Sequence, residues 1–259
     1  MPSDKYYRTE ALSLKNMSLG ESDLLVTLYS KDIGKFRAVA KGARKSTSKL
    51  VGHFEPLTIN NLSITKATNL DIINQAETIE DFRNLKSSLI GLAQGIYINE
   101  LIDGFGTESY ANSDLYQLCQ EVLKVLTSSP QSKFTLMFFE LHLLRLSGLM
   151  PELYQCIECR IELSPGAHRF SSNHGGTLCI ECQPMEANIR NISVPALKVL
   201  RMLHNTELKK LPELHMNQSI AQELDSILGN TIHFWLDKEI RSKTFLEHLR
   251  RSATHPIYS

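Results

Sequence analysis

Four of the five cysteines form two pairs of identical sequence. Each pair reads Cys-Ile-Glu-Cys, with Cys156 and Cys159 in the first pair and Cys179 and Cys182 in the second, nineteen residues later. One C-x-x-C pair can hold a metal ion from a tight turn, and two pairs complete a tetrahedral four-sulfur site. Because four sulfurs leave no position for water or substrate, the spacing predicts one structural Zn²⁺ per chain rather than a catalytic metal.

Other interpretations of these cysteines stay open at this stage. Two disulfides would require an oxidising compartment, and nothing in the sequence suggests export. Four buried thiols without a metal are a second alternative. His168 and His174 lie between the two pairs, so either could replace one cysteine as a ligand.

Basic residues are concentrated in one segment of a chain that is neutral overall, with 28 Lys and Arg against 28 Asp and Glu. The segment from Ile33 to Phe54 has no acidic residue and contains Lys35, Arg37, Lys41, Arg44, Lys45 and Lys49. Such a segment can follow a phosphate backbone, so these six residues are the predicted DNA-binding site. The alternative is a solvated loop. A second group, at 238–251, is diluted by Glu239 and Glu247 and is more typical of a charged helix end.

The basic segment lies within a series of short β-like runs. Residues 8–14, 24–30, 35–41, 57–65 and 70–77 alternate between apolar and polar side chains, with a change of parity at Asn60-Asn61 that a β-bulge would absorb. Five short strands in this length favour a small barrel, either an OB-fold or an SH3-like barrel. Residues 42–49 read as a flexible loop after the third strand, able to follow a phosphate backbone.

A helical period replaces the strand period after Asp81. One apolar stripe contains Leu85, Leu89, Leu92, Ile96 and Leu101, and further helices are expected at 113–126, 134–147, 193–203 and 220–235. Cys119 and His142 fall on apolar faces and are expected to be core residues, as is Trp235.

These patterns predict an α+β multidomain protein in which a zinc module is inserted into a helical domain. The predicted boundaries are 1–80 for an OB-fold DNA-binding domain, 81–152 for the first part of the helical domain, 153–186 for the zinc module and 187–259 for the second helical part. No run approaches the length of a membrane span, so a cytoplasmic protein is expected. The sequence has no nucleotide-binding or hydrolase motif, and we expect no enzymatic activity.

Several segments, in order, resemble the RecO family of bacterial recombination mediators. They are Gly20–Asp23, Gly34-Lys35, Ala38–Lys45 and Gln75–Glu77 in the strand region, and Phe139–Leu144, Gly148–Leu153, Phe170-Ser171 and Gly175-Gly176 in the helical region and zinc module. The resemblance implies a non-catalytic DNA-repair protein, associated with the nucleoid, that binds single- and double-stranded DNA and anneals complementary strands. It also implies contacts with the single-strand binding protein and RecR, and through them the loading of the recombinase RecA.

Two other classes of function remain as alternatives. A zinc-ribbon transcription or RNA-binding factor would read base sequence rather than backbone. A metal-dependent enzyme would need an exchangeable ligand position on the metal.

Overall fold

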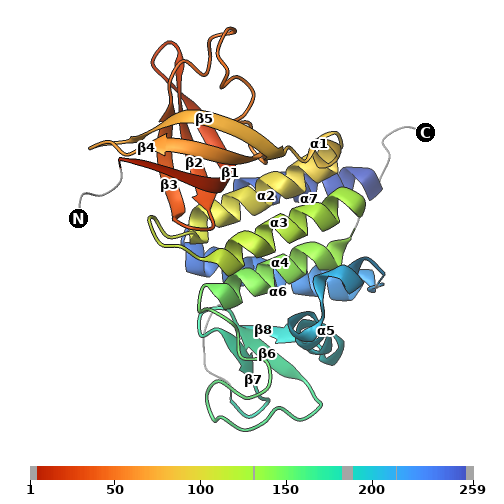
Figure 1. Ribbon diagram of the computed structural model, residues 1–259. Coiled ribbons are helices and arrows are strands. Elements are labelled where there is room, and N and C mark those ends of the chain that lie inside the picture. The colour runs from red at the N-terminus through yellow and green to blue at the C-terminus, as the bar shows by residue number, and fades with distance from the viewer. Residues whose placement is uncertain (1–4, 131, 183–188, 214, 255–259) are drawn as a thin grey trace. The chain divides into compact units, whose positions relative to one another are not determined.

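The computed structural model describes residues 5–130, 132–182, 189–213 and 215–254. The chain forms two compact units (Figure 1). The first unit consists of residues 1–127 and 240–259, and the second of residues 128–239. The four predicted segments stay a prediction, because compactness alone does not define a folding domain.

The first unit begins with a five-stranded closed barrel. The strands are β1 (Tyr6–Leu19), β2 (Asp23–Ser30), β3 (Gly34–Ala40), β4 (Ile59–Thr65) and β5 (Asp71–Glu80), and their order around the barrel is β1-β2-β3-β5-β4. β1 pairs with both β2 and β4, and the β3–β5 pairing is parallel. This is the OB-like arrangement, so the predicted fold class is confirmed.

Inward side chains of the five strands fill the barrel. Val26, Leu28, Phe36, Leu62 and Ile64 are each buried in this core. The change of parity near Asn60 coincides with a register shift against β5, where Ile59 pairs with Glu80 and Asn60 with Thr78. Asn60 is fully buried, and both polar atoms of its side chain are hydrogen-bonded. Its amide nitrogen donates to the His53 carbonyl at 2.7 Å, and its oxygen accepts from the Thr78 hydroxyl at 2.9 Å.

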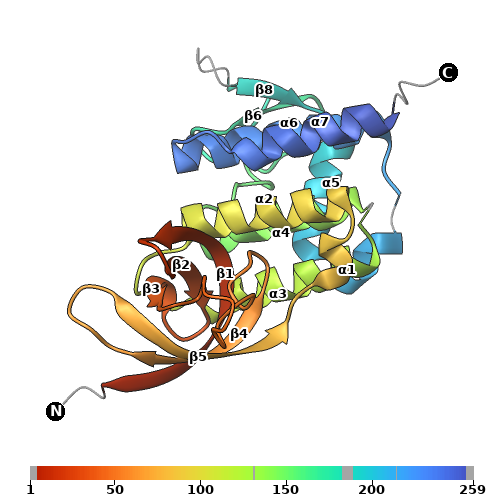
Figure 2. The same ribbon diagram turned by 90° about the horizontal axis from the view of Figure 1, so that it is seen from above.

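The first unit also contains four helices, α1 (Arg83–Lys86), α2 (Leu89–Phe105), α3 (Ser113–Ser128) and α7 (Arg241–Thr254). Helix α2 lies against the barrel (Figure 2). The side-chain amide of Asn99 on α2 donates to the carbonyls of Ser13 and Leu14, both at 3.0 Å, beside the β1 bulge. Gly95 allows close packing, because a Cβ there would lie 2.4 Å from the Leu57 side chain. These contacts fix α2 on the barrel wall.

Helix α7 packs on α2, although the whole second unit separates the two helices in the sequence. The Glu100 carboxylate on α2 accepts hydrogen bonds from the backbone N–H of Arg241 at 3.3 Å and of Ser242 at 3.0 Å, and also from the Ser242 hydroxyl. A carboxylate at these first N–H groups replaces an N-cap and complements the helix dipole. Glu100 therefore holds the start of α7.

We expect Glu100→Ala to loosen α7 by about 1–2 kcal/mol, the typical cost of removing an N-cap. Backbone amides of α7 should then exchange with solvent faster, as measured by hydrogen exchange. Glu121→Ala, which removes an exposed carboxylate of α3, is the control. Equal exchange in α7 for both variants would contradict this role of Glu100.

The second unit contains α4 (Lys133–Leu146), α5 (Val194–Asn205), the 3₁₀ helix η1 (Leu208–Glu213) and α6 (Gln218–Leu236), with α4 packed against the other three. A small sheet of β6 (His168–Ser171), β7 (Gly176–Leu178) and β8 (Ile189–Ile192) has the order β7-β6-β8. Ser193 caps α5 by accepting from the Ala196 N–H at 3.2 Å, as Ser193 followed by Pro195 predicts.

Two residues expected on buried faces are exposed. Leu89 at the start of α2 is 58% exposed, and Trp235 near the end of α6 is 40% exposed. The buried face of α2 instead contains Ala93, Tyr97 and Ile98. The expected burial of these two side chains is therefore wrong, whereas Cys119 and His142 are core residues as predicted.

His142 on α4 is held as one neutral tautomer. Its Nε2–H donates to the Leu203 carbonyl at 3.2 Å, and its Nδ1 accepts from the Arg145 Nε–H at 3.2 Å. Burial lowers the pKa of His142, and the charges of Arg145 and His204 lower it further, against the opposing effect of the Leu203 hydrogen bond. The imidazole therefore resists protonation in the folded protein.

This pKa predicts a loss of stability in mild acid. Below the unfolded-state pKa of about 6.5, His142 binds a proton in the unfolded chain but stays neutral in the folded chain. The free energy of unfolding therefore falls as the pH falls from about 6.5 towards the lowered pKa. Each pH unit between the two pKa values is worth about 1.4 kcal/mol. Denaturant titrations at pH 7.5 and 5.5 should show a smaller decrease for His142→Gln. An equal decrease in both proteins would contradict the prediction.

Candidate metal centre and nucleic-acid interface

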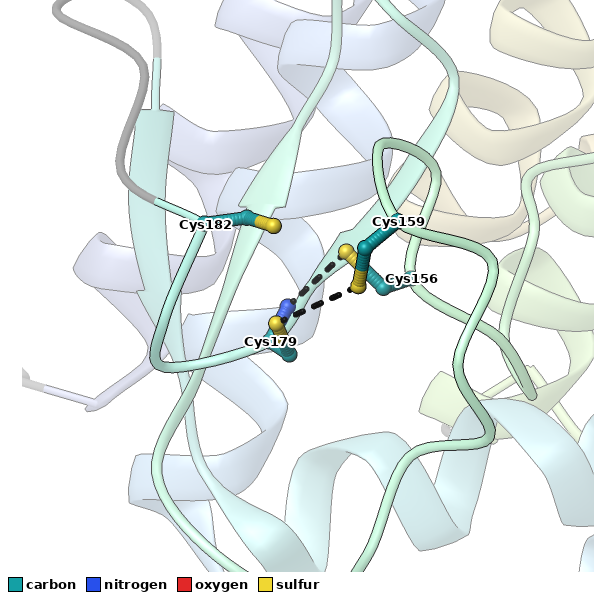
Figure 3. A group of neighbouring side chains, drawn as sticks. All are labelled: Cys156, Cys159, Cys179 and Cys182. Carbon is teal, nitrogen blue, oxygen red and sulfur yellow. Dashed lines mark hydrogen bonds between the residues drawn. The ribbon is translucent and has the colours of Figure 1, made fainter.

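The four cysteines of the two pairs converge on one point of the second unit (Figure 3). Their sulfur atoms all lie within 4.8 Å of one another, and the Cys159 and Cys179 sulfurs are 3.8 Å apart. A tetrahedral ion with metal–sulfur bonds of about 2.3 Å requires sulfurs about 3.8 Å apart. A disulfide needs about 2.0 Å, and all five cysteines are free. The donor set fits a four-coordinate metal ion.

Local hydrogen bonds shape the first pair into a tight turn. The Cys156 carbonyl accepts from the Arg160 N–H at 3.0 Å, the Cys156 N–H donates to the Ile161 carbonyl at 2.9 Å, and Arg160 has a φ of 62°. Burial raises the pKa of the Cys156 thiol, but the backbone N–H groups of Cys179, Cys159 and Glu158 outweigh it and lower the pKa to about 6. Cys156 is therefore prepared to bind as a thiolate.

Strand β7 positions the second pair against the first. The Ile157 N–H donates to the Thr177 carbonyl at 3.0 Å, and the Thr177 N–H donates to the Glu152 carbonyl at 2.9 Å. Gly176 makes this approach possible, because a Cβ there would lie 2.6 Å from the Ile157 side chain and 2.9 Å from the Glu152 backbone nitrogen. Cys179 follows directly after β7 and so faces the first turn.

Neither histidine between the pairs joins the cluster. Within the described residues, the metal-ligating group consists of the four cysteines. The His168 Nε2 hydrogen-bonds to the Ser164 carbonyl at 2.6 Å, and the His174 Nδ1 hydrogen-bonds to the Ser171 hydroxyl at 3.1 Å.

A cavity of about 480 Å³ beside the first turn is lined by apolar residues together with Glu152, Glu158, Arg160, His174 and His204. Its mixed charges select no ligand class.

The structure divides the six predicted DNA-binding residues into two groups. Lys35 and Arg37 lie on β3 and contact acidic residues that follow in α2 and the loop after it. The Lys35 ammonium donates to the Asp103 carbonyl at 2.6 Å, and its side chain is only 16% exposed. Arg37 is 53% exposed, with its guanidinium 4.0 Å from the Glu108 carboxylate. Lys35 is thus committed to contacts within the first unit.

The other four, Lys41, Arg44, Lys45 and Lys49, are exposed after β3. Arg44 Nη1 donates to the carbonyls of Gly20 and Glu21, both at 3.2 Å. Lys41, Lys45 and Lys49, here called the lysine loop, form no ion pair within the described part of the chain. The lysine loop therefore offers three cations to solvent directly after β3.

The segment that carries the lysine loop forms a series of turns. Successive turns are closed by hydrogen bonds from the N–H of Lys45 to the Gly42 carbonyl at 3.0 Å and from that of Ser48 to the Lys45 carbonyl at 2.9 Å. The Asp23 carboxylate accepts from the Gly42 N–H at 2.8 Å, which lowers the pKa of Asp23, and the charges of Lys41 and Lys45 lower it further. Asp23 therefore anchors the base of this segment. Sequence patterns gave no indication of the roles of Asp23, Asp103 and Glu108.

Comparison with known proteins places this chain in a class of recombination proteins. The model described as "Recombination protein O N terminal" matches residues 3–82, and "Recombination protein O C terminal" matches residues 86–244. The chain belongs to the RecO family of DNA repair proteins.

Individual relatives match over nearly their whole length. The DNA repair protein RecO of Dehalococcoides mccartyi (strain 195) is 33% identical over 246 residues, which cover 95% of this chain and 97% of the relative. The protein of the same name from Desulforamulus reducens is 33% identical over 96% of each chain. That from Desulforudis audaxviator is 32% identical over 96% of this chain and 100% of the relative. Within the described residues, no helix has the length and apolar character needed to cross a membrane.

Proposed function

We propose that this chain is a non-catalytic DNA-binding protein of recombinational repair that holds single strands by their backbone and anneals them. The observation that supports it most is the lysine loop on an OB-like barrel, since OB-folds bind single strands through basic surfaces and loops. Double-stranded DNA is expected to bind the same cations through its phosphates. Holding phosphates leaves base edges free, so two complementary strands can pair.

We further propose that the four cysteines hold one structural Zn²⁺. The ion would neutralise thiolates that otherwise repel one another, and would fix the two turns to each other. With all four positions taken by sulfur, the ion supplies no chemistry to a substrate. This donor set therefore favours a binding protein over a metal-dependent enzyme.

The partners are proposed from family membership. The single-strand binding protein and RecR would contact the chain directly, and RecA would be loaded onto strands coated by the single-strand binding protein as a result. A repair protein of this kind works at the chromosome, so we place it in the cytoplasm with the nucleoid.

Titration with the acidic, apolar tail peptide of the single-strand binding protein at low salt should change fluorescence anisotropy. Absence of a change would contradict the first contact.

Titrations with single-stranded DNA, duplex DNA and RNA at several salt concentrations test the DNA-binding function. Backbone recognition predicts nearly equal affinity for different sequences, and the five predicted cations other than Lys35 limit the slope of log K against log salt to about 3.5. Sequence-selective binding would favour the alternative, a zinc-ribbon transcription or RNA-binding factor. Retention of affinity at high salt would contradict phosphate contacts.

Glu108 competes with phosphate for Arg37, so its neutralisation should strengthen binding. An exposed ion pair is worth about 0.2–1 kcal/mol, which corresponds to an increase in affinity of up to about 5-fold for Glu108→Gln. Single-stranded and duplex DNA should gain equally. The control is Glu121→Gln, because Glu121 lies on α3 and not beside β3. This variant should bind DNA with unchanged affinity. If its affinity rises as much as that of Glu108→Gln, the change in net charge alone explains the gain.

A further inference from the structure

The loop that follows α2 is attached to the edge of β3. The Lys35 N–H donates to the Thr107 carbonyl at 3.2 Å, and the Ser109 N–H donates to the Lys35 carbonyl at 2.9 Å, so Glu108 forms a parallel bridge with Lys35. This loop thus extends the sheet at the point where β3 begins. Its position is set by backbone hydrogen bonds rather than by side chains.

Gly34 fixes the end of this loop. A Cβ at Gly34 would lie 2.0 Å from the Tyr110 carbonyl oxygen and 3.1 Å from that of Thr107, and Gly34 has a φ of 80°. No other residue type allows this approach without a shift of the backbone. The backbone of Tyr110 is therefore held against the first residue of the basic strand.

The Tyr110 side chain is 67% exposed, although its backbone is held in place. The neighbouring tyrosines of the same unit differ, because Tyr29 and Tyr116 are buried and stack on each other with ring centroids 6.5 Å apart. Exposing a large ring on an anchored loop forgoes the stabilisation that burial would give. The exposed ring lies on the loop whose Glu108 approaches Arg37.

We propose that Tyr110 is a base-stacking residue of the nucleic-acid site and that its ring favours unpaired over paired bases. The inference rests on the proposed function, because it requires a strand that runs along β3, from the lysine loop after its end past Arg37 to Tyr110 at its start. Sites for single strands combine a basic surface with aromatic rings on which bases stack, whatever the sequence. In a duplex the faces of each base are already covered by its neighbours, so the ring gains nothing there.

The test compares Tyr110→Leu with Tyr110→Phe. Loss of one stacked base costs about 1–3 kcal/mol, so Tyr110→Leu should weaken binding of an unstructured oligo(dT) about 5- to 150-fold. Duplex affinity and the salt slope should stay at wild-type values, because the substitution removes no charge. Tyr110→Phe keeps the ring and should bind like the wild type. Both variants keep the backbone hydrogen bonds that attach the loop.

A fluorescent reporter gives a second measurement. The chain has one tryptophan, Trp235, so Tyr110→Trp in a Trp235→Phe background places a single indole at the proposed site. Its emission should be quenched by oligo(dT) and not by duplex.

Two results would overturn the inference while leaving the proposed function intact. The first is that Tyr110→Leu loses affinity for oligo(dT) and for duplex by the same factor. The second is that Tyr110→Leu binds oligo(dT) as tightly as the wild type, whereas substitution of the lysine loop abolishes oligo(dT) binding. If the wild-type protein binds no oligo(dT), the proposed function itself fails.

Discussion

Replacing Cys156 by serine should release the metal and unfold the zinc module. Structural zinc is worth roughly 10–16 kcal/mol of apparent binding free energy in small modules at neutral pH, far more than the packing of so small a sheet can replace. Cys156 is the buried member of the cluster and receives backbone hydrogen bonds at its sulfur, so its loss affects the whole site. Elemental analysis of freshly purified protein should give one zinc for the wild type and none for the variant.

Cys119→Ala is the matched control, because Cys119 is buried in α3, outside the cluster. It should keep one zinc, and thiol titration after chelation should then expose four reactive groups. The barrel of the Cys156→Ser variant should stay folded, because it belongs to the other compact unit. Metal-free wild-type protein, or full zinc content in the serine variant, would contradict the structural zinc.

Replacing Lys41, Lys45 and Lys49 together by alanine should reduce the affinity for single-stranded DNA by about two orders of magnitude at 0.1 M salt. Each lost phosphate contact removes about 0.7 from the salt slope, so the slope should fall by about 2. The loss should be nearly the same for every sequence, and annealing should fall with it. Fluorescence anisotropy over a range of salt concentrations measures both quantities.

The control replaces Lys133, Lys198 and Lys209, three exposed lysines of the second unit, and keeps the same net charge as the test variant. If both triple variants lose affinity equally, the lysine loop has no special role. Lys35→Ala should behave differently, because its ammonium contacts Asp103, and the loss should appear mainly as reduced thermal stability.

The cysteine cluster and the barrel were predictable because their signals are local. Two C-x-x-C pairs specify the four sulfurs that the structure brings together. Period-two patterns specify the strands, and the stripe from Leu115 to Leu126 specifies the buried face of α3. A pattern of this kind arises when an element has one buried face.

Helix α2 lacks such a pattern because it is covered on two sides. Gly95 and Asn99 contact the barrel region, whereas Tyr97 and Glu100 face α7, with the Lys243 ammonium 5.9 Å from the centroid of the Tyr97 ring. Buried positions then surround most of the helix, and the stripe through Leu89 is misleading.

The environment of the basic residues could not be predicted either, because their partners are distant in sequence. Asp103 and Glu108 lie about seventy residues beyond Lys35 and Arg37, and a backbone contact at Gly34 brings their loop to β3. A charge count along the sequence treats Lys35 and Lys41 alike. Only tertiary structure separates the lysine that is used internally from the one that faces solvent.

The return of α7 to the first unit has a consequence for synthesis on the ribosome. The barrel and helices α1 to α3 emerge first, then the entire second unit, and only afterwards the helix that covers Tyr97 and Glu100. The nascent first unit therefore carries an uncovered face of α2 throughout translation of the second unit, a period in which such surfaces are prone to aggregation and chaperone binding. Slow translation between α2 and α7 would lengthen that exposure.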